Sequence, residues 1–178
     1  MFLYAEYYFS RQSMYKIKEL SPDHSAIILE VINDASNAYK GVIPADRWKE
    51  PYMSAKELAD EIRSGIQFYG WFEDGFLLGI AGIQNVDSLD LIRHCYVRTN
   101  HQRRGIGGAL LRHLLTLAHS SVILVGTWED ATWAVQFYER HGFTLVLHDE
   151  KNKLLQEYWN IPRRQIETSV VLKHRLTD

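Results

Sequence analysis

The sequence is poor in cysteine, in long apolar runs and in excess charge of either sign. Cys95 is the single cysteine among 178 residues, which excludes an internal disulfide and is typical of a reducing compartment. No apolar run approaches the ~20 residues that a membrane-spanning helix needs. Lys and Arg number 20 against 22 Asp and Glu, so the basic excess of a nucleic-acid-binding protein is missing. We therefore expect a cytoplasmic protein that engages neither membranes nor nucleic acids.

The length and composition fit one globular domain. Hydrophobic residues make up 46% of the chain, enough for a substantial core. Residues 1–13 lack the order of basic, apolar and small residues of a signal peptide, and Met14 directly precedes an alternating segment that predicts a strand. We expect one domain over residues 14–178, and residues 1–13 as an extension that either lies upstream of the natural start or packs poorly. The histidines are scattered without ligand spacing, so we expect no metal.

The most informative stretch is rich in glycine and runs from Val97 to Leu115. Before it, residues 91–97 are rich in branched and aromatic side chains and predict a strand. Within and after it, apolar residues recur at helical spacing from Ile106 to Leu117. The glycines therefore lie where a strand turns into a helix, whose first amides have no internal partner and carry partial positive charge. Such a turn binds phosphate closely, and Arg103 and Arg104 add positive charge there.

Several kinds of site share a turn of this type. A P-loop would need Gly-Lys-Ser or Gly-Lys-Thr after the glycines, which is missing. A dinucleotide-binding turn would need a third glycine where Leu110 stands, although Glu129 lies at roughly the distance of the acidic residue that such a fold requires. A plain tight turn flanked by two solvated arginines also fits the pattern.

Two motifs together resemble the GNAT N-acetyltransferase superfamily. Gln102 to Gly107 reads Gln-x-x-Gly-x-Gly, similar to the superfamily's loop for the pyrophosphate of acyl-CoA. Ala134 to Phe143 reads Ala-x-x-Phe-Tyr-x-x-x-Gly-Phe, similar to a later helix and strand. The resemblance extends from about Met14 to the end and is best over residues 77–143. Within the superfamily, the chain resembles a prokaryotic subgroup whose substrate is unassigned. The residues that carry this resemblance are Ile-Arg-His before the loop and Gln-Ile-Glu-Thr-Ser-Val-Val-Leu near the C-terminus.

The pattern of elements agrees with this resemblance. We expect an α/β (α+β) fold with a mixed, mostly antiparallel sheet of about seven strands and roughly four or five helices. Predicted strands cover residues 15–20, 67–73, 76–84, 91–97, 122–127, 143–147 and 165–172. Predicted helices cover residues 21–39, 55–64, 131–141 and 150–159 besides the one after the glycines, with Ser21, Ser54 and Asp130 as caps. The helix at 150–159 departs from the short connection of many GNAT domains.

The resemblance implies roles for individual residues. The backbone of residues 95–97 would hold the thioester carbonyl, and that of residues 97–99 would pair with the pantetheine arm. The implied binding set for acetyl-CoA is Tyr96, Val97, Arg98, Thr99, Gln102, Arg103, Arg104, Gly105, Ile106, Gly107, Gly108 and Ala109. Tyr138 would protonate the leaving thiolate, for which a phenol of pKa about 10 is suited; alternatively it is a core aromatic.

The proton acceptor is less defined by the sequence. Many GNAT enzymes have a glutamate on the strand before the loop, and this strand has none. His94 is a candidate base because histidine titrates near neutrality, and its parity with Asp90 predicts that both face the same side. A structural histidine and a water chain remain alternatives. An asparagine that often contacts pantetheine is replaced by Ala131, where Trp128 or Trp133 could supply packing instead.

The loop from Lys40 to Met53 lies where the superfamily covers the acceptor. It carries Trp48 and Tyr52 beside Asp46 and Glu50, which would suit a cationic amine, or the aromatics only pin the loop to the core. We expect an acetyl-CoA-dependent N-acetyltransferase for a primary amine of a small molecule or peptide, and leave a homodimer open. The alternatives are a non-catalytic acyl-CoA-binding module and a dinucleotide-binding oxidoreductase.

Overall fold

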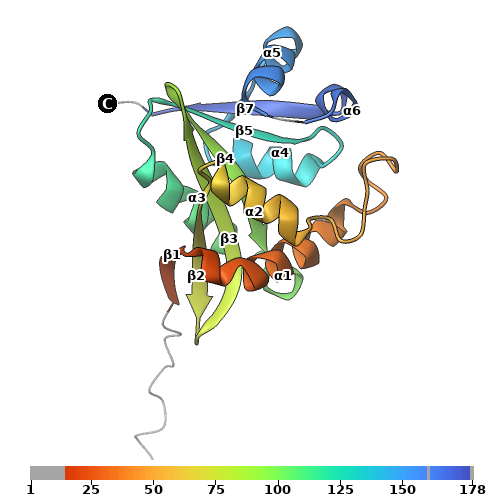
Figure 1. Ribbon diagram of the computed structural model, residues 1–178. Coiled ribbons are helices and arrows are strands. Elements are labelled where there is room, and N and C mark those ends of the chain that lie inside the picture. Colours follow the sequence, from red (N-terminus) through yellow and green to blue (C-terminus); the bar gives the residue numbers. More distant parts are fainter. Residues whose placement is uncertain (1–14, 160, 177–178) are drawn as a thin grey trace, which may run out of the picture.

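The fold is built on one twisted sheet. The structure, a computed structural model, describes residues 15–159 and 161–176 (Figure 1), so the predicted extension at residues 1–13 lies outside the described residues. The seven strands are ordered β1 (Tyr15–Leu20), β2 (Gln67–Glu73), β3 (Phe76–Val86), β4 (Leu89–Val97), β5 (Val122–Trp128), β7 (Ser169–Arg175) and β6 (Thr144–Leu145). Among the strands of the described residues, only β4 and β5 are parallel neighbours. The predicted mixed, mostly antiparallel sheet is confirmed.

Helices cover both faces of the sheet. On one face lie α1 (Ser25–Ala35), α2 (Ala55–Arg63) and α5 (His148–Tyr158), whose apolar residues pack with Phe68, Leu91 and Leu124. On the other lie α3 (Ile106–Leu117) and α4 (Thr132–Glu139), packed with Ile92 and Val125. A short α6 (Arg163–Glu167) precedes β7. Among the described helices, none is both long and apolar enough to cross a membrane.

Local signals set most element boundaries correctly. Ser54 caps α2, since its Oγ accepts from the Glu57 N–H at 3.3 Å and the Glu57 carboxylate accepts from the Ser54 N–H at 2.9 Å. The turn at Asp74-Gly75 has positive φ at both residues, 50° and 86°, as expected for a tight hairpin.

Three local predictions were wrong. Asp130 does not cap α4, which begins after Ala131 with no side-chain cap. The segment predicted as a strand from Gln165 begins instead inside α6, and β7 starts only at Ser169. Across residues 15–159 and 161–176, the extra short helix brings the number of α-helices to six rather than four or five.

The strands β4 and β5 pair only briefly. Their parallel register covers Asp90 to Ile92 against Ile123 to Val125, and beyond it the two strands separate. Figure 1 shows β2 to β4 running steeply while β5 and β7 cross the top of the view. Residues 93–97 therefore have no strand neighbour on the β5 side. The resulting gap in the sheet is where the candidate site lies.

Candidate active site

A cavity of about 880 Å³ occupies the gap between β4 and β5. It is lined by residues 92–97 of β4 and 125–128 of β5, and by helices on both faces of the sheet. At one end lies the glycine loop, and at the other lie α2 and the α5–α6 segment. The cavity thus joins the predicted phosphate site to a second compartment across the sheet.

The glycine loop presents unused amides to this cavity. Within the described part of the chain, the N–H groups of residues 103–108 donate to no protein acceptor, and the first helical bond is Ala109 N–H to Gly105 O at 3.0 Å. Gly105 has φ +83° and Arg103 φ +60°, so the chain turns sharply before α3. Gln102 ties the loop to β4 because its Nε2 donates to Val97 O at 3.1 Å. A row of free amides at a helix start fits a pyrophosphate.

Positive charge surrounds these amides. Arg103, Arg112 and Arg140 line the cavity and form no ion pair with any described residue. Arg104 instead binds both carboxylate oxygens of Glu73, at 2.7 and 2.9 Å, outside the cavity. The cationic groups at the phosphate end of the cavity are therefore Arg103 and two arginines that the sequence motif did not indicate. Arg112 lies on α3 one turn after Gly108, whereas Arg140 follows α4 and is brought there by the packing of α4 beside the start of α3.

The other predicted binding residues divide into two groups. Tyr96 and Val97 line the cavity, as do Gln102 and residues 105–108. Arg98 and Thr99 do not: the Arg98 N–H donates to Leu78 O at 2.8 Å and the Thr99 N–H to the Asp34 carboxylate at 2.7 Å. Ala109 packs against the core. The backbone available to an extended ligand arm is thus limited to residues before Arg98.

Tyr138 is buried on α4 and lines the cavity. Its hydroxyl makes no hydrogen bond within the described residues, while burial raises the pKa of Tyr138 well above its ordinary value, and the nearby Cys95 and Tyr39 act in the same direction. The phenol is therefore protonated at neutral pH. Cys95 lies in the same wall, and burial raises the pKa of its thiol to about 12, which makes it an inert thiol rather than a nucleophile.

A bulge in β4 places His94 on an unexpected face. Between the pairs Ile80–Tyr96 and Gly82–Arg93, two residues of β4 oppose the single residue Ala81, and His94 has φ +50°. The extra residue breaks the alternation of side chains. Asp90 faces α3, where its carboxylate accepts from the His119 and Ser120 amides at 2.8 Å, whereas His94 faces α2. The prediction that the two share a face was wrong.

On that face His94 contacts a carboxylate. Its Nε2 is in ion-pair contact with Glu61 of α2, and its ring stacks on Phe68 with centroids 5.8 Å apart. Both members of the pair line the cavity. Sequence reasoning missed Glu61 because α2 reads as an ordinary amphipathic helix, and nothing local connects it to β4.

Four aromatic rings lie together along one wall of the cavity. The centroid of the Tyr39 ring lies 5.8 Å from that of Tyr52, 5.8 Å from that of Trp133 and 6.4 Å from that of Tyr96. Burial raises the pKa of Tyr39 and of Tyr96, so both hydroxyls remain neutral.

The residues near Ala131 also have defined places. The Trp128 indole N–H donates to the Tyr52 hydroxyl at 3.0 Å. Ala131 is fully buried and packs with Trp128 and Ile43. Trp133 is the tryptophan exposed at the cavity, with 41% of its surface accessible.

The acidic residues of the 40–53 loop do not reach the cavity. Glu50 pairs with Lys40 at 2.6 Å, and Asp46 is 3.7 Å from both Arg47 and Arg164. Trp48 and Tyr52 pack with the Trp128 cluster. The loop is thus pinned by its aromatics, and the cavity takes its negative charge from Glu61 instead.

Comparisons with known proteins agree with this geometry. Residues 29–154 match the acetyltransferase (GNAT) domain family. No curated protein matches the chain by sequence.

Solved structures with the same fold are distant in sequence. A PaiA N-acetyltransferase from Thermoplasma acidophilum in complex with coenzyme A superposes with a TM-score of 0.70 at 18% identity, over 92% of this chain and 99% of that one. A GNAT-family acetyltransferase from Staphylococcus aureus gives 0.71 at 17% identity, over 92% and 100% of the two chains. The ribosomal-protein-S18-alanine N-acetyltransferase of Escherichia coli gives 0.68 at 16% identity, over 93% and 96%.

The family match covers most of the chain, and the free amides, arginines and split sheet lie within it. The chain therefore belongs to the GNAT family of acetyltransferases.

Proposed function

We propose that the protein transfers an acetyl group from acetyl-CoA directly to a primary amine of a small molecule or peptide. The observation that carries this proposal is the continuous cavity, which joins the free amides of residues 103–108 to the His94–Glu61 pair past Tyr138. A donor and an acceptor could meet there at the gap in the sheet. In support, one structural neighbour was solved with coenzyme A.

The residues at the donor end fit the phosphates and the thioester of acetyl-CoA. The amides of residues 103–108 and the side chains of Arg103, Arg112 and Arg140 would hold the phosphates. A Cβ on Gly107 would make only ordinary contact, 3.6 Å from the Phe137 ring, whereas one on Gly108 would lie 2.7 Å from His141 Nε2. Gly108 therefore allows His141 to approach the helix start. The backbone of residues 95–97, which has no strand neighbour on the β5 side, would hold the thioester carbonyl.

The residues at the acceptor end would remove a proton from the amine and protonate the leaving thiolate. An alkyl amine of pKa about 10.4 is neutral to only a few parts in ten thousand at pH 7, so a base raises the reactive fraction. We assign this role to His94, with Glu61 in contact with its Nε2 as the group that orients the ring. The neutral amine nitrogen attacks the carbonyl, the C–N bond forms and the C–S bond breaks. Tyr138 donates its proton to the departing thiolate, and the resulting tyrosinate regains a proton as the acylated nitrogen loses its second one.

A screen of amines with free-thiol detection tests the proposal. We expect release of coenzyme A that depends on one class of amine, with stoichiometric acetylated product by mass spectrometry. Tight binding of acetyl-CoA without turnover across the whole library would favour the alternative, a non-catalytic acyl-CoA-binding module. Binding of NAD(P) but not of CoA would instead indicate a dinucleotide site.

A further inference from the structure

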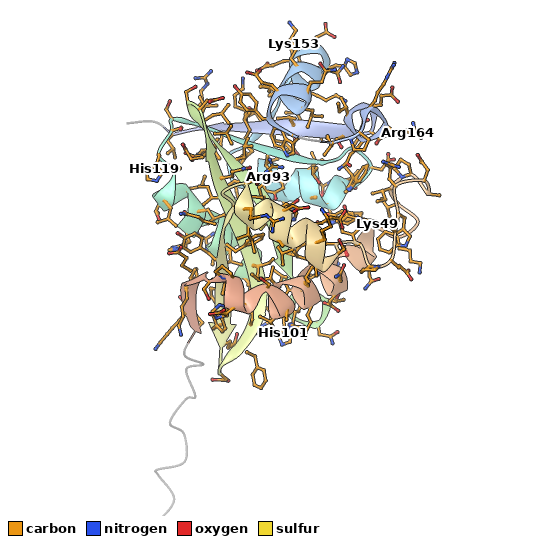
Figure 2. All side chains as sticks on the ribbon, in the orientation of Figure 1. Lys49, Arg93, His101, His119, Lys153 and Arg164 are labelled. Atoms are coloured by element: carbon orange, nitrogen blue, oxygen red, sulfur yellow. The ribbon has the colours of Figure 1, made fainter. Side chains whose placement is uncertain are left out.

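One half-buried cation in the acceptor compartment has no role in the steps above. Arg93 precedes His94 in the β4 bulge, so the two consecutive side chains lie on the same face of the sheet, toward α2 and α5. Figure 2 shows Arg93 near the centre of the molecule, whereas Lys153 and Arg164 lie at its periphery. Arg93 lines the same cavity as Glu61 and His94.

The Arg93 guanidinium is fixed in place by neutral groups. Its Nη2 donates to the Gln84 Oε1 at 3.0 Å and to the Tyr158 carbonyl at 3.1 Å, and its centre lies 5.1 Å from the ring of Trp159. Gln84 is itself held, because its Nε2 donates to the Ser64 carbonyl at 2.8 Å. These contacts restrict the side chain without neutralising its charge, apart from the partial negative charge at the end of α5.

One donor of this guanidinium is unused. The Nε of Arg93 is buried and has no acceptor among the described residues, and Arg93 makes no ion pair with them. Burial lowers the pKa of Arg93, and the charge of Glu61 opposes that shift. A buried, unsatisfied donor of a charged group is costly, and an anion bound beside the guanidinium would offset part of that cost. Such a ligand would reach the guanidinium from the cavity at Nη1, which makes no hydrogen bond with the described residues.

We propose that the acceptor is a zwitterion of the amino-acid type, whose carboxylate binds Arg93 and whose amine lies at the His94–Glu61 pair. The inference rests on the proposed function, since it names the acceptor of that same site. One fixed cation and one carboxylate on the same side of the sheet match the two charges of such a molecule. A di- or polycationic amine would instead place positive charge against Arg93. Leu155, Trp159 and Ile161 line the same compartment and would contact an apolar side chain.

The test compares matched ligands that differ only in the carboxylate. Each of the twenty amino acids is titrated calorimetrically into the protein saturated with coenzyme A, so that binding is measured without turnover. The tightest binder is then compared with its amide and its decarboxylated amine, and with phosphoethanolamine as a different anion. We expect the amino acid to bind about ten- to a hundredfold more tightly than its amide, the contribution of one charged hydrogen bond.

Variants assign this preference to Arg93. Arg93→Gln should abolish the acid-over-amide ratio while leaving amide binding within about threefold, and Arg93→Lys should restore part of it because the charge returns. Arg63→Gln is the matched control, since Arg63 is exposed on α2 and pairs with Asp60. Thermal melting checks that each variant is folded. A purely structural role would weaken acid and amide binding equally.

The outcomes separate this inference from the proposed function. The zwitterion assignment would be overturned by any of four results. These are equal binding of acid and amide, an unchanged acid-over-amide ratio in Arg93→Gln, tighter binding of phosphoethanolamine than of the amino acid, and no binding by any amino acid. Turnover with plain amines in any of these cases would leave acetyl transfer intact. Conversely, carboxylate-dependent binding without acetylation would support the acceptor class and reject the transfer.

Discussion

Gly107 offers a direct test of the phosphate site. It is the second residue of α3, and a Cβ added there would lie 3.6 Å from the Phe137 ring and from Val97 Cγ2, which is ordinary contact. A side chain at this position is therefore compatible with the fold. Gly107→Ala should even stabilise the helix, by up to about 1 kcal/mol.

Gly107→Glu would add a negative charge beside the bound phosphates. Repulsion between unit charges about 6 Å apart is about 0.7 kcal/mol in bulk water and about 2.8 kcal/mol at an effective dielectric constant of about 20. A value near the middle, about 1.4 kcal/mol, corresponds to a tenfold loss of affinity. We therefore expect the affinity for acetyl-CoA to fall at least about tenfold, and the loss to shrink as salt concentration rises.

Calorimetry on four proteins isolates the charge. Gly107→Gln has nearly the size of Gly107→Glu without its charge, and Gly107→Ala measures the effect of the Cβ alone. The melting temperature of each variant reports its folding. Unchanged affinity in a folded Gly107→Glu would refute the phosphate assignment of residues 102–109, and equal losses for Glu and Gln would refute the electrostatic account of the loss.

Three further predictions follow from the same contacts. Tyr138→Phe should lower kcat by about 10²–10⁴ with little change in acetyl-CoA affinity. Full activity in this variant would show that Tyr138 is a core aromatic and not the acid. His94→Ala and Glu61→Gln should each lower kcat, because both would impair removal of the proton from the amine, whereas full activity in His94→Ala would indicate that water removes that proton. Ser54→Ala should lower the free energy of unfolding by about 1 kcal/mol in a denaturant titration at neutral pH. Burial raises the pKa of Glu57, but hydrogen bonds from Lys49 and Ser54 outweigh it and lower the pKa to about 2. The contribution of the ionised Glu57 to the free energy of unfolding is complete above the ordinary carboxyl pKa of 4.5 and is lost as the pH falls toward 2. A free energy of unfolding that does not change between these pH values would contradict this contribution.

The phosphate end of the site could be predicted because its signals are local. A strand, a glycine turn and an amphipathic helix lie within one continuous stretch, and free amides at a helix start follow from chain geometry alone. The same holds for Ser54 and for the hairpin at Asp74-Gly75. Arg140 illustrates the limit, since it follows α4, which meets the start of α3 only in the folded chain.

The acceptor end could not be predicted because it depends on one inserted residue. Strand parity holds for Asp90 and Ile92, but the bulge opposite Ala81 shifts every later side chain of β4 to the other face. The bulge has no signal in the sequence, because its residue with positive φ is His94 and not the glycine that usually adopts this conformation. The partner Glu61 lies on a helix more than thirty residues earlier. Its role follows only from the tertiary contact.

The backbone of His94 gives a physical reason to connect this bulge with function. A residue other than glycine at φ +50° is held in a sparsely populated conformation at a cost of order 1–3 kcal/mol, which the surrounding packing must offset. A regular strand would avoid that cost but would send His94 toward α3, away from Glu61. The bulge instead places Arg93 and His94 side by side on the cavity wall and leaves the backbone after them without a neighbour on the β5 side. The local strain thus accounts for the position of the proposed base His94 beside Arg93, whereas Arg93 keeps the face that regular alternation from Leu91 gives it.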